Sequence, residues 1–278
     1  MIDAAAKCSF DGHGYLVTRG LFDAEETRLL RDHFMRLREA GNYPGDVVGV
    51  DPSSDDPLKR YPRMIHMHRW DRVALDWLLE SRLARCLSSL LDGLEPFAVQ
   101  TMLYFKPPSA RGQAVHQDQY YLRVDPGTCI AAWMALDSCN EENGCLVVVP
   151  GSHEWPLLCT VGADTNESFT DLTVPLPGDA ELVPVRMDPG DVLFFNGSLV
   201  HGSAPNRSDR FRRALIGHYI GGDARRVSYA YHPVLRMDGS EVELEAGSGG
   251  GPCGEWVERD SRRVIELTGF AADPRTTE

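Results

Sequence analysis

The sequence predicts a mainly β fold, a sandwich or barrel whose outside is buttressed by helices from the N-terminal third. From about residue 96 to 222, short apolar or alternating runs follow one another, separated by Gly, Pro, Asn and Asp. Residues 22–93 instead have helical periodicity. No repeat or linker divides the chain, so we expect a single domain over residues 1–278, with C-terminal loops over 223–278.

Two segments of the N-terminal third are expected to be helices. In residues 24–40 apolar side chains recur at helical spacing, and Asp23 and Glu26 form a D-x-x-E capping pattern. A second helix is expected over residues 72–91, with Asp71 as its cap.

Six apolar or alternating runs of the later part are expected to be strands. They are FAVQTMLYF, CIAAWMALD, CLVVVPG, AELVPVRM, DVLFFNG and RALIGHYI. Residues 159–177 and the Gly-rich residues 247–254 are expected to be mobile loops.

Composition and charge indicate a soluble protein that acts on small molecules. Apolar residues make up 42% and charged residues 25% of the chain, and the formal charge is −13. Nucleic acid and anionic membranes attract positive surfaces, so neither is expected as a partner. No segment approaches the roughly 20 apolar residues of a membrane span, and none resembles a signal peptide. We therefore expect a cytoplasmic location.

The seven cysteines are odd in number, scattered and never spaced as C-x-x-C. This pattern indicates neither a disulfide framework nor a zinc site, and predicts reduced thiols that mostly pack in the interior.

A candidate metal site lies in the segment AVHQDQYYL. His116 and Asp118 stand two residues apart in a strand-like stretch, which would place both side chains on one face. His201 follows a later apolar strand and could complete a set of two histidines and one carboxylate, the set typical of non-haem Fe(II). Taken alone, an H-x-D pair would more often be a hydrogen-bonded surface couple than a metal site. His66 and His68 also share a face, but no carboxylate stands at matching spacing.

An ordered set of motifs surrounds these residues: MLYFKPP, HQD, AAWMALD, ENGCLVVVPGSH, PGDVLFF and HGSAPNRSDRFRRA. Over residues 97–220 this set resembles the phytanoyl-CoA dioxygenase family of 2-oxoglutarate oxygenases, as does the opening FDGHGYLVTRGLFDAEETRLL. The resemblance implies a double-stranded β-helix, a cupin-like jelly roll. It also implies a dioxygenase that uses Fe(II), 2-oxoglutarate as cosubstrate, and O₂.

The resemblance assigns roles residue by residue. His116, Asp118 and His201 would be the catalytic iron ligands. Arg212 would pair with the distal carboxylate of 2-oxoglutarate, since a guanidinium can meet a carboxylate with two parallel hydrogen bonds. Arg210 would share a strand face with Arg212, but the F-R-R-A register favours Arg212.

Further residues would complete the cosubstrate pocket. Ser203 matches a hydroxyl that helps to hold the same carboxylate. Gln100, Met102 and Tyr104 alternate along one strand and so face one side, which the resemblance identifies as the pocket. Trp133 matches its wall, although Met102 and Trp133 would be ordinary core residues in about half of such strands.

The implied reaction is oxidation of a C–H bond in a free small molecule, with hydroxylation as the leading outcome and natural-product metabolism as the expected setting. Desaturation, epimerisation or ring formation on the same centre remain open, as do a non-catalytic jelly-roll binding protein and a cupin-type enzyme without 2-oxoglutarate. Halogenation is not expected, because related halogenases have a small residue where Asp118 stands. Few basic clusters are available for the phosphates of an acyl-CoA.

Residues that select the substrate cannot be fixed from the sequence, and neither can the oligomeric state. Candidates near the metal are Tyr120, Tyr121, Arg123, His66 and the loop 159–177.

Overall fold

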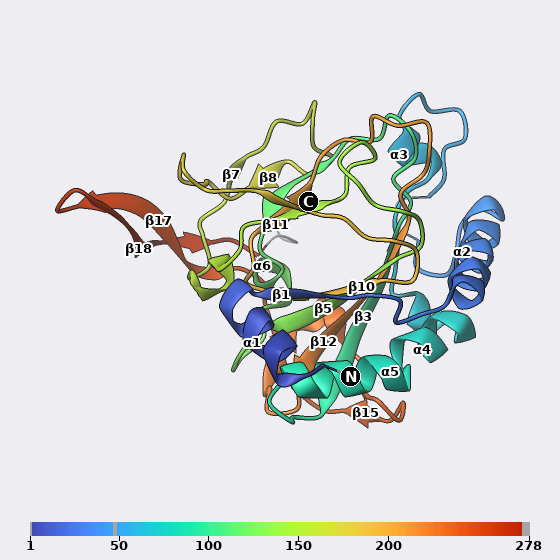
Figure 1. The fold of residues 1–278 in the computed structure, drawn as a ribbon, viewed down its shortest axis with the longest axis horizontal. Helices are drawn as coiled ribbons and strands as arrows, with labels where there is room; N and C mark the ends of the chain where they lie inside the picture. The colour runs from blue at the N-terminus through green and yellow to red at the C-terminus, as the bar shows by residue number, and fades with distance from the viewer. Residues whose placement is uncertain (1, 47–48, 274–278) are drawn as a thin grey trace.

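Two antiparallel sheets form the centre of the computed structural model, which describes residues 2–46 and 49–273 (Figure 1). The larger sheet has the order β1-β10-β5-β12-β3-β14-β15, with β2 also paired to β3, and the smaller has the order β4-β11-β6-β9. The large sheet comprises β1 (Tyr15–Thr18), β2 (Met64–Ile65), β3 (Pro96–Tyr104), β5 (Cys129–Ala135), β10 (Val192–Asn196), β12 (Ala214–Gly221), β14 (Val234–Arg236) and β15 (Glu241–Val242). The small sheet comprises β4 (Gln113–His116), β6 (Leu146–Val148), β9 (Val183–Val185) and β11 (His201–Ser203). The predicted mainly β fold is confirmed, and each of the six predicted runs contains a strand.

The two faces of the large sheet pack against different partners, because successive side chains of a strand alternate between its faces. Trp133 and Ile216 belong to an apolar cluster that also contains Val148 of the small sheet, so this cluster lies between the sheets. Met134, which follows Trp133, and Leu215, which precedes Ile216, belong to a second cluster on the other face.

Helices cover this second face and one edge of the large sheet (Figure 1). They are α1 (Ala4–His13), α2 (Ala24–Glu39), α4 (Arg72–Leu78) and α5 (Ser81–Leu90). Two further helices, α3 (Pro57–Arg60) and α6 (Gln119–Leu122), lie elsewhere, and short 3-10 turns occur at Met67–Arg69, Ser152–Glu154 and Tyr229–Tyr231. Among the described residues, no helix has both the length and the apolar character needed to cross a membrane.

The first predicted helix is confirmed, and the second is wrong in one respect. Asp23 caps α2 and forms the expected capping box with Glu26. The segment 72–91 is broken into α4 and α5 at Leu79, and the Glu80 side chain caps the new helix by accepting from the backbone of Arg82. The two helices can therefore follow the curved sheet at different angles.

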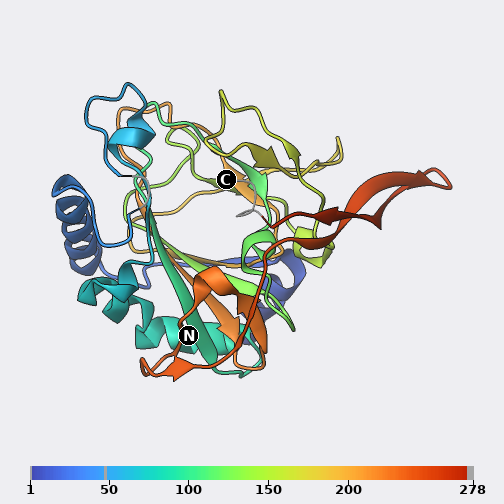
Figure 2. The same ribbon diagram turned by 180° about the vertical axis from the view of Figure 1, so that it is seen from behind.

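The prediction of C-terminal loops is also wrong for the described residues. The segment contains β13 (Arg226–Ser228), β14, β15, β16 (Glu245–Gly247), β17 (Gly251–Arg259) and β18 (Arg262–Ala271). β17 and β18 pair as a long antiparallel hairpin that extends away from the two sheets in both views (Figures 1 and 2). Residues 247–254 thus include part of a strand, and residues 159–177 contain the short hairpin β7 (Val161–Gly162) and β8 (Leu172–Thr173).

One pair of cysteines departs from the expectation of reduced thiols. Cys159 and Cys253 form a disulfide, whereas Cys8, Cys86, Cys129, Cys139 and Cys145 are free. The bond joins the segment before β7 to strand β17. The two cysteines are 94 residues apart in the sequence, so their spacing gave no sign of the pairing.

Candidate metal and cosubstrate site

Two of the predicted metal ligands come from neighbouring strands of the small sheet. His116 is the last residue of β4, His201 is the first residue of β11, and the two are direct partners in the antiparallel register. Their ring centres lie 4.3 Å apart. Strand pairing therefore brings together two imidazoles that are 85 positions apart in the chain.

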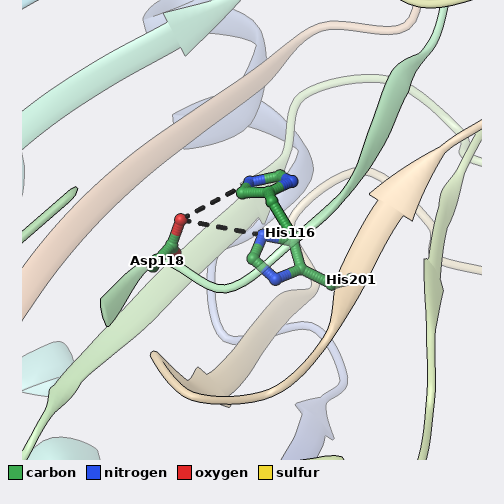
Figure 3. Close-up of side chains that lie close together, drawn as sticks. All are labelled: His116, Asp118 and His201. Carbon is green, nitrogen blue, oxygen red and sulfur yellow. Dashed lines mark ion pairs between the residues drawn. The ribbon is translucent and has the colours of Figure 1, made fainter. Parts of the chain in front are cut away.

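Asp118 completes the cluster, but not by the strand alternation that the sequence indicated. The strand ends at His116, and Asp118 has helical backbone angles at the start of α6. Its Oδ1 lies 3.6 Å from Nε2 of His116 and 3.8 Å from Nε2 of His201 (Figure 3). One ligand atom from each of the three residues lies within 4.8 Å of the others. The predicted ligand set converges, although the local reason given for it was wrong.

Hydrogen bonds orient both histidines as metal ligands. Nδ1 of His116 lies 2.9 Å from the carbonyl oxygen of Ala114, and Nδ1 of His201 lies 3.0 Å from that of Leu199. A carbonyl can only accept, so each Nδ1 carries the proton and donates it. In a neutral ring Nε2 then keeps its lone pair, and Nε2 is the atom that faces Asp118. Such backbone bonds are the usual way in which proteins fix the tautomer of a metal-binding histidine.

The pKa values of His201 and Asp118 are also shifted in the directions that suit metal ligands. Burial lowers the pKa of His201 to about 4, with His116 adding to the effect, so His201 is neutral at pH 7. Burial alone would raise the pKa of Asp118, but the surrounding histidines hold it well below its usual value. A buried carboxylate beside two imidazoles matches the donor set of a divalent iron site.

His218 also contacts the metal cluster, and the sequence analysis did not include it among the candidates. Its Nε2 lies 3.2 Å from Oδ2 of Asp118. His218 lies on β12 opposite Gln100 of β3, next to a register shift between His218 and Tyr219. Its contact with Asp118 shows that its side chain faces the space between the sheets. A buried histidine on an alternating strand was the only signal in the sequence.

Arg212 differs from the neighbouring arginines in being buried without an acidic partner among the described residues. Arg210 is exposed and pairs with Glu142, and Arg213 pairs with Asp137. The Arg212 guanidinium lies 5.2 Å from the centre of the Trp133 ring, and its Nε donates to the carbonyl oxygen of Gly144. Arg212, which the F-R-R-A register favours, is thus the one of these three arginines without an acidic partner among the described residues.

Lys106 is a second buried basic side chain near Arg212, and the sequence analysis did not include it among the candidates. Its Nζ donates to the Ser203 hydroxyl at 2.9 Å and also to backbone carbonyls of Gly144 and Ala204. Burial and the Arg212 charge hold the pKa of Lys106 well below its usual value. The sequence feature that could have identified Lys106 is its place after the apolar residues of MLYFKPP. Two buried basic side chains without a carboxylate partner among the described residues make this end of the site suited to a carboxylate of the cosubstrate.

Gly144 permits this close arrangement. Its backbone has a φ of +69°, and a Cβ atom there would lie 2.3 Å from the carbonyl oxygen of Ala204 and 2.8 Å from Nζ of Lys106. Any other residue would be strained at this φ and would push Lys106 or the Ala204 backbone away.

The remaining predicted cosubstrate residues lie on the inner face of the large sheet. Met102 is partly buried against the inner cluster, opposite Ile216, and Trp133 lies in that cluster. Gln100 pairs in register with His218, and its buried Oε1 has no hydrogen-bond partner among the described residues.

The candidates for substrate selection divide into two groups. The Tyr121 ring centre lies 6.1 Å from that of His116, and the His66 ring centre lies 6.2 Å from that of Tyr231. Tyr120 instead packs in a separate cluster with Cys253. Arg123 lies against the backbone of Gly251, where a Cβ would meet its guanidinium.

Within the loop 159–177, Phe169 approaches the inner strands. Its ring centre lies 6.0 Å from that of Tyr104 on β3. This loop therefore supplies an aromatic side chain to the same region as Tyr121.

Two relatives and one solved structure illustrate what the chain is similar to. Phytanoyl-CoA dioxygenase 1 of Oryza sativa subsp. japonica is 29% identical over 243 residues, which cover 76% of this chain and 86% of that protein. The peroxisomal phytanoyl-CoA dioxygenase of Homo sapiens is 32% identical over 232 residues, covering 78% and 68%. EctD from S. alaskensis, solved with 2-oxoglutarate and 5-hydroxyectoine, has a TM-score of 0.64 at 25% identity, covering 81% of this chain and 78% of that one.

The fold and the site are those of a jelly-roll oxygenase that depends on iron and 2-oxoglutarate. The family model of phytanoyl-CoA dioxygenase (PhyH) matches residues 10–214. The chain belongs to the phytanoyl-CoA dioxygenase family, so the resemblance inferred from the motifs is confirmed.

Proposed function

We propose that the protein is an Fe(II)- and 2-oxoglutarate-dependent dioxygenase that hydroxylates a C–H bond of a small molecule. The observation that carries the proposal is the pairing of two arrangements in one jelly roll. One is the buried cluster of His116, Asp118 and His201, and the other is the pair of buried basic side chains Lys106 and Arg212. A metal-binding protein without 2-oxoglutarate would have no use for the second arrangement.

Each residue has a role that follows from its surroundings. His116 and His201 present their Nε2 atoms, and Asp118 presents a carboxylate oxygen near both. Iron held there would supply the reduction of O₂, coupled to decarboxylation of 2-oxoglutarate to succinate and CO₂. Three protein ligands leave further positions of an octahedral ion for cosubstrate and O₂.

The opposite end of 2-oxoglutarate would meet Arg212. Its planar guanidinium can bind the distal carboxylate with two hydrogen bonds, and the Ser203 hydroxyl can donate a third. Lys106 holds Ser203 at 2.9 Å. The Arg212 guanidinium lies 5.2 Å from the centre of the Trp133 ring, and Met102 and Gln100 would line the cosubstrate between this end and the metal. The apolar walls exclude water from the reacting atoms.

The substrate proposed is a free small molecule of natural-product metabolism, and not an acyl-CoA. The formal charge of −13 opposes a ligand that carries several phosphates. Two of the arginines that could form a basic cluster, Arg210 and Arg213, are paired with acidic side chains. Long-chain acyl-CoAs that release succinate at ordinary enzymatic rates would contradict this part of the proposal.

The metal and cosubstrate roles can be tested without knowing the substrate. Fe(II) and 2-oxoglutarate added anaerobically should give the weak visible charge-transfer band of a chelated oxoacid. His116→Ala and His201→Ala should each abolish the band, whereas His13→Ala, at an exposed helix end, should keep it. A band of full intensity in both ligand variants would refute the metal assignment. Succinate release in the presence of a candidate substrate then separates a catalyst from a binding protein.

A further inference from the structure

The disulfide between Cys159 and Cys253 is a feature that the roles above do not use. It joins the residues before β7 to β17, in the hairpin that extends away from the two sheets (Figures 1 and 2). Gly269 of β18 is the register partner of Cys253, and a Cβ at Gly269 would lie 2.5 Å from Sγ of Cys159 and 3.0 Å from Sγ of Cys253. A glycine at this position therefore leaves the room that the bond needs.

The disulfide reinforces a short backbone contact between the two segments. The N–H of Gly254 donates to the carbonyl oxygen of Leu157 at 2.8 Å, and its carbonyl oxygen accepts from the N–H of Cys159 at 3.0 Å. This contact is an isolated bridge and not part of a ladder. Trp256 of the hairpin packs against the apolar cluster that contains Leu158, but apolar contact is non-directional. The covalent bond therefore fixes how the hairpin lies against this segment.

The segment before Cys159 in turn holds the side chain between two of the metal ligands. Gln117 is the middle residue of the H-Q-D motif and is fully buried. Its Oε1 accepts from the N–H of Leu158 at 2.8 Å, and its Nε2 donates to the carbonyl oxygens of Pro156 and Ser198 at 3.3 and 2.9 Å. A buried amide that loses such partners is destabilised. The ligands on either side of Gln117 are therefore tied to the segment that Cys159 anchors.

The hairpin side of the disulfide contacts the residues that follow Asp118. Gly250, directly before β17, donates its N–H to the carbonyl oxygen of Tyr120 at 2.8 Å, and Tyr120 and Cys253 pack in one buried cluster. Tyr120 belongs to α6, and Asp118 directly precedes the first residue of this helix. The two halves of the disulfide thus reach residues 117–120 from two sides.

We propose that the Cys159–Cys253 bond is a thiol–disulfide exchange site for a dithiol reductant, and that opening it weakens Fe(II) binding. The closed bond holds residues 117–120 in the position from which Asp118 reaches the metal. The open form leaves an isolated backbone bridge between the two segments, and the chain gains the conformational freedom that the bond removes. This inference goes beyond the proposed reaction and rests on its metal site.

The exchange is balanced by the reductant. Cys159 is half-buried and Cys253 is buried, so a thiolate from solvent would attack the sulfur of Cys159. The disulfide bond breaks, and Cys253 leaves as a thiolate and takes up a proton. The second thiol of the reductant then displaces the sulfur of Cys159. Two cysteine thiols form, and the reductant, having given up two electrons, ends as a disulfide.

Fe(II) affinity measured in both redox states tests the proposal. The oxidised protein, and the same protein reduced with dithiothreitol and freed of it by anaerobic desalting, are each titrated with Fe(II) against a chelator. Reduction should weaken Fe(II) binding about tenfold, the lower end of the range found when partners of metal ligands are removed. Glutathione disulfide should restore both the bond and the affinity. Equal affinity in the two states would overturn the proposal.

Two cysteine variants separate this bond from the other thiols. Cys159→Ala, at the half-buried end of the bond, should bind Fe(II) as weakly as the reduced protein and should no longer respond to dithiothreitol. Cys8→Ala is the matched control, because Cys8 is an exposed free cysteine, and it should respond as the unchanged protein does. If Cys159→Ala still lost affinity on reduction, another cysteine would be responsible and the proposal would fail.

Alkylation followed by mass measurement establishes the state of the bond. Carried out in denaturant, it should count five thiols in the oxidised protein and seven after reduction under native conditions. Seven thiols after treatment with glutathione disulfide would show that the bond does not form. Five thiols after native treatment with dithiothreitol would show that a reductant does not reach it. Either count would overturn the proposal.

Amide hydrogen exchange in the metal-free protein separates this inference from the function on which it rests. The N–H groups of Leu158 and Gly250, which bond to Gln117 and Tyr120, should exchange faster after reduction, whereas those of β3 should not change. Equal exchange of both groups in the two states would overturn the inference alone. An oxidised protein that binds no Fe(II) would instead refute the metal assignment.

Discussion

His218 Nε2 lies 3.2 Å from Oδ2 of Asp118, the carboxylate oxygen other than the one nearest to His116 and His201. The carboxylate is thus held from the side opposite to the other histidines. Because the acceptor is an ionised carboxylate, Nε2 of His218 is the donor.

Removing this donor should loosen the metal site. His218→Ala is expected to weaken Fe(II) binding by about 10- to 100-fold, the range found when partners of metal ligands are removed. His218→Gln, whose amide can still donate to Asp118, should recover part of the loss. Competition with an Fe(II) chelator measures both affinities, with His13→Ala as the control. Equal affinity in His218→Ala and the unchanged protein would show that Asp118 needs no such support.

Arg212→Lys should separate cosubstrate binding from metal binding. Lysine keeps the charge but loses the fork and the flat contact with Trp133, so the apparent KM for 2-oxoglutarate should rise about tenfold or more. Iron content should stay near that of the unchanged protein. Arg210→Lys is the matched control, because Arg210 is exposed and pairs with Glu142. If Arg210→Lys raised the apparent KM and Arg212→Lys did not, Arg210 would be the residue that binds the distal carboxylate of 2-oxoglutarate.

His68 should make the fold sensitive to acid. The Thr101 hydroxyl accepts from the backbone N–H of His68 and lies 2.9 Å from its Nδ1, to which it can donate only while the ring is neutral. Burial lowers the pKa of His68 to about 4 from an ordinary value of 6.5. Below pH 6.5 the unfolded chain therefore takes up a proton that the folded chain refuses, and stability falls until about pH 4.

The size of this effect can be measured by urea unfolding of the metal-free protein. Between pH 7 and pH 5, His68 should account for a loss of about 2 kcal/mol. His68→Gln should lose correspondingly less stability over that interval, whereas His13→Gln should match the unchanged protein. The same pH slope in both variants would mean that His68 does not resist protonation.

A buried ion pair should make a large contribution to the stability of the helical side. Arg38 of α2 and Asp46 are paired at 2.9 Å, and both side chains are almost fully buried. Arg38→Met leaves the carboxylate buried without its partner, which should cost about 3–5 kcal/mol in the free energy of unfolding. Asp46→Asn, added to Arg38→Met, should restore part of it.

The exposed pair of Arg28 and Glu25 is the control for this prediction. Arg28→Ala should leave the free energy of unfolding close to that of the unchanged protein, because solvent screens the exposed pair. Urea unfolding of the three variants measures these differences, and an equally small effect of Arg38→Met would show that Asp46 finds another partner.

Periodicity predicted the elements that obey one regular pattern over their whole length. The strands β3, β5 and β12 and the helix α2 are of this kind. The break between α4 and α5 was missed because residues 72–91 contain no Gly or Pro that would mark it. The C-terminal hairpin was missed because glycine and charged residues dominate its sequence.

The sequence identified which residues form the metal site, but it did not predict how the fold brings them together. The H-x-D spacing identified two ligands, yet Asp118 reaches them from the start of a helix. His218 required the register of β12 against β3, which no single-chain pattern specifies. Lys106 required the approach of Gly144 and Ala204, which come from two other segments. These relationships arise from long-range pairing, which a local pattern cannot encode.

The disulfide between Cys159 and Cys253 encloses residues 160–252 in a covalent ring, and both His201 and Arg212 belong to that ring. Proteolytic cleavage of a single peptide bond within the ring would open it without separating the two pieces. On a non-reducing gel the nicked protein would keep its full mass, and after reduction it would run as two fragments. A preparation can therefore look intact while the chain that carries the third metal ligand is already cut.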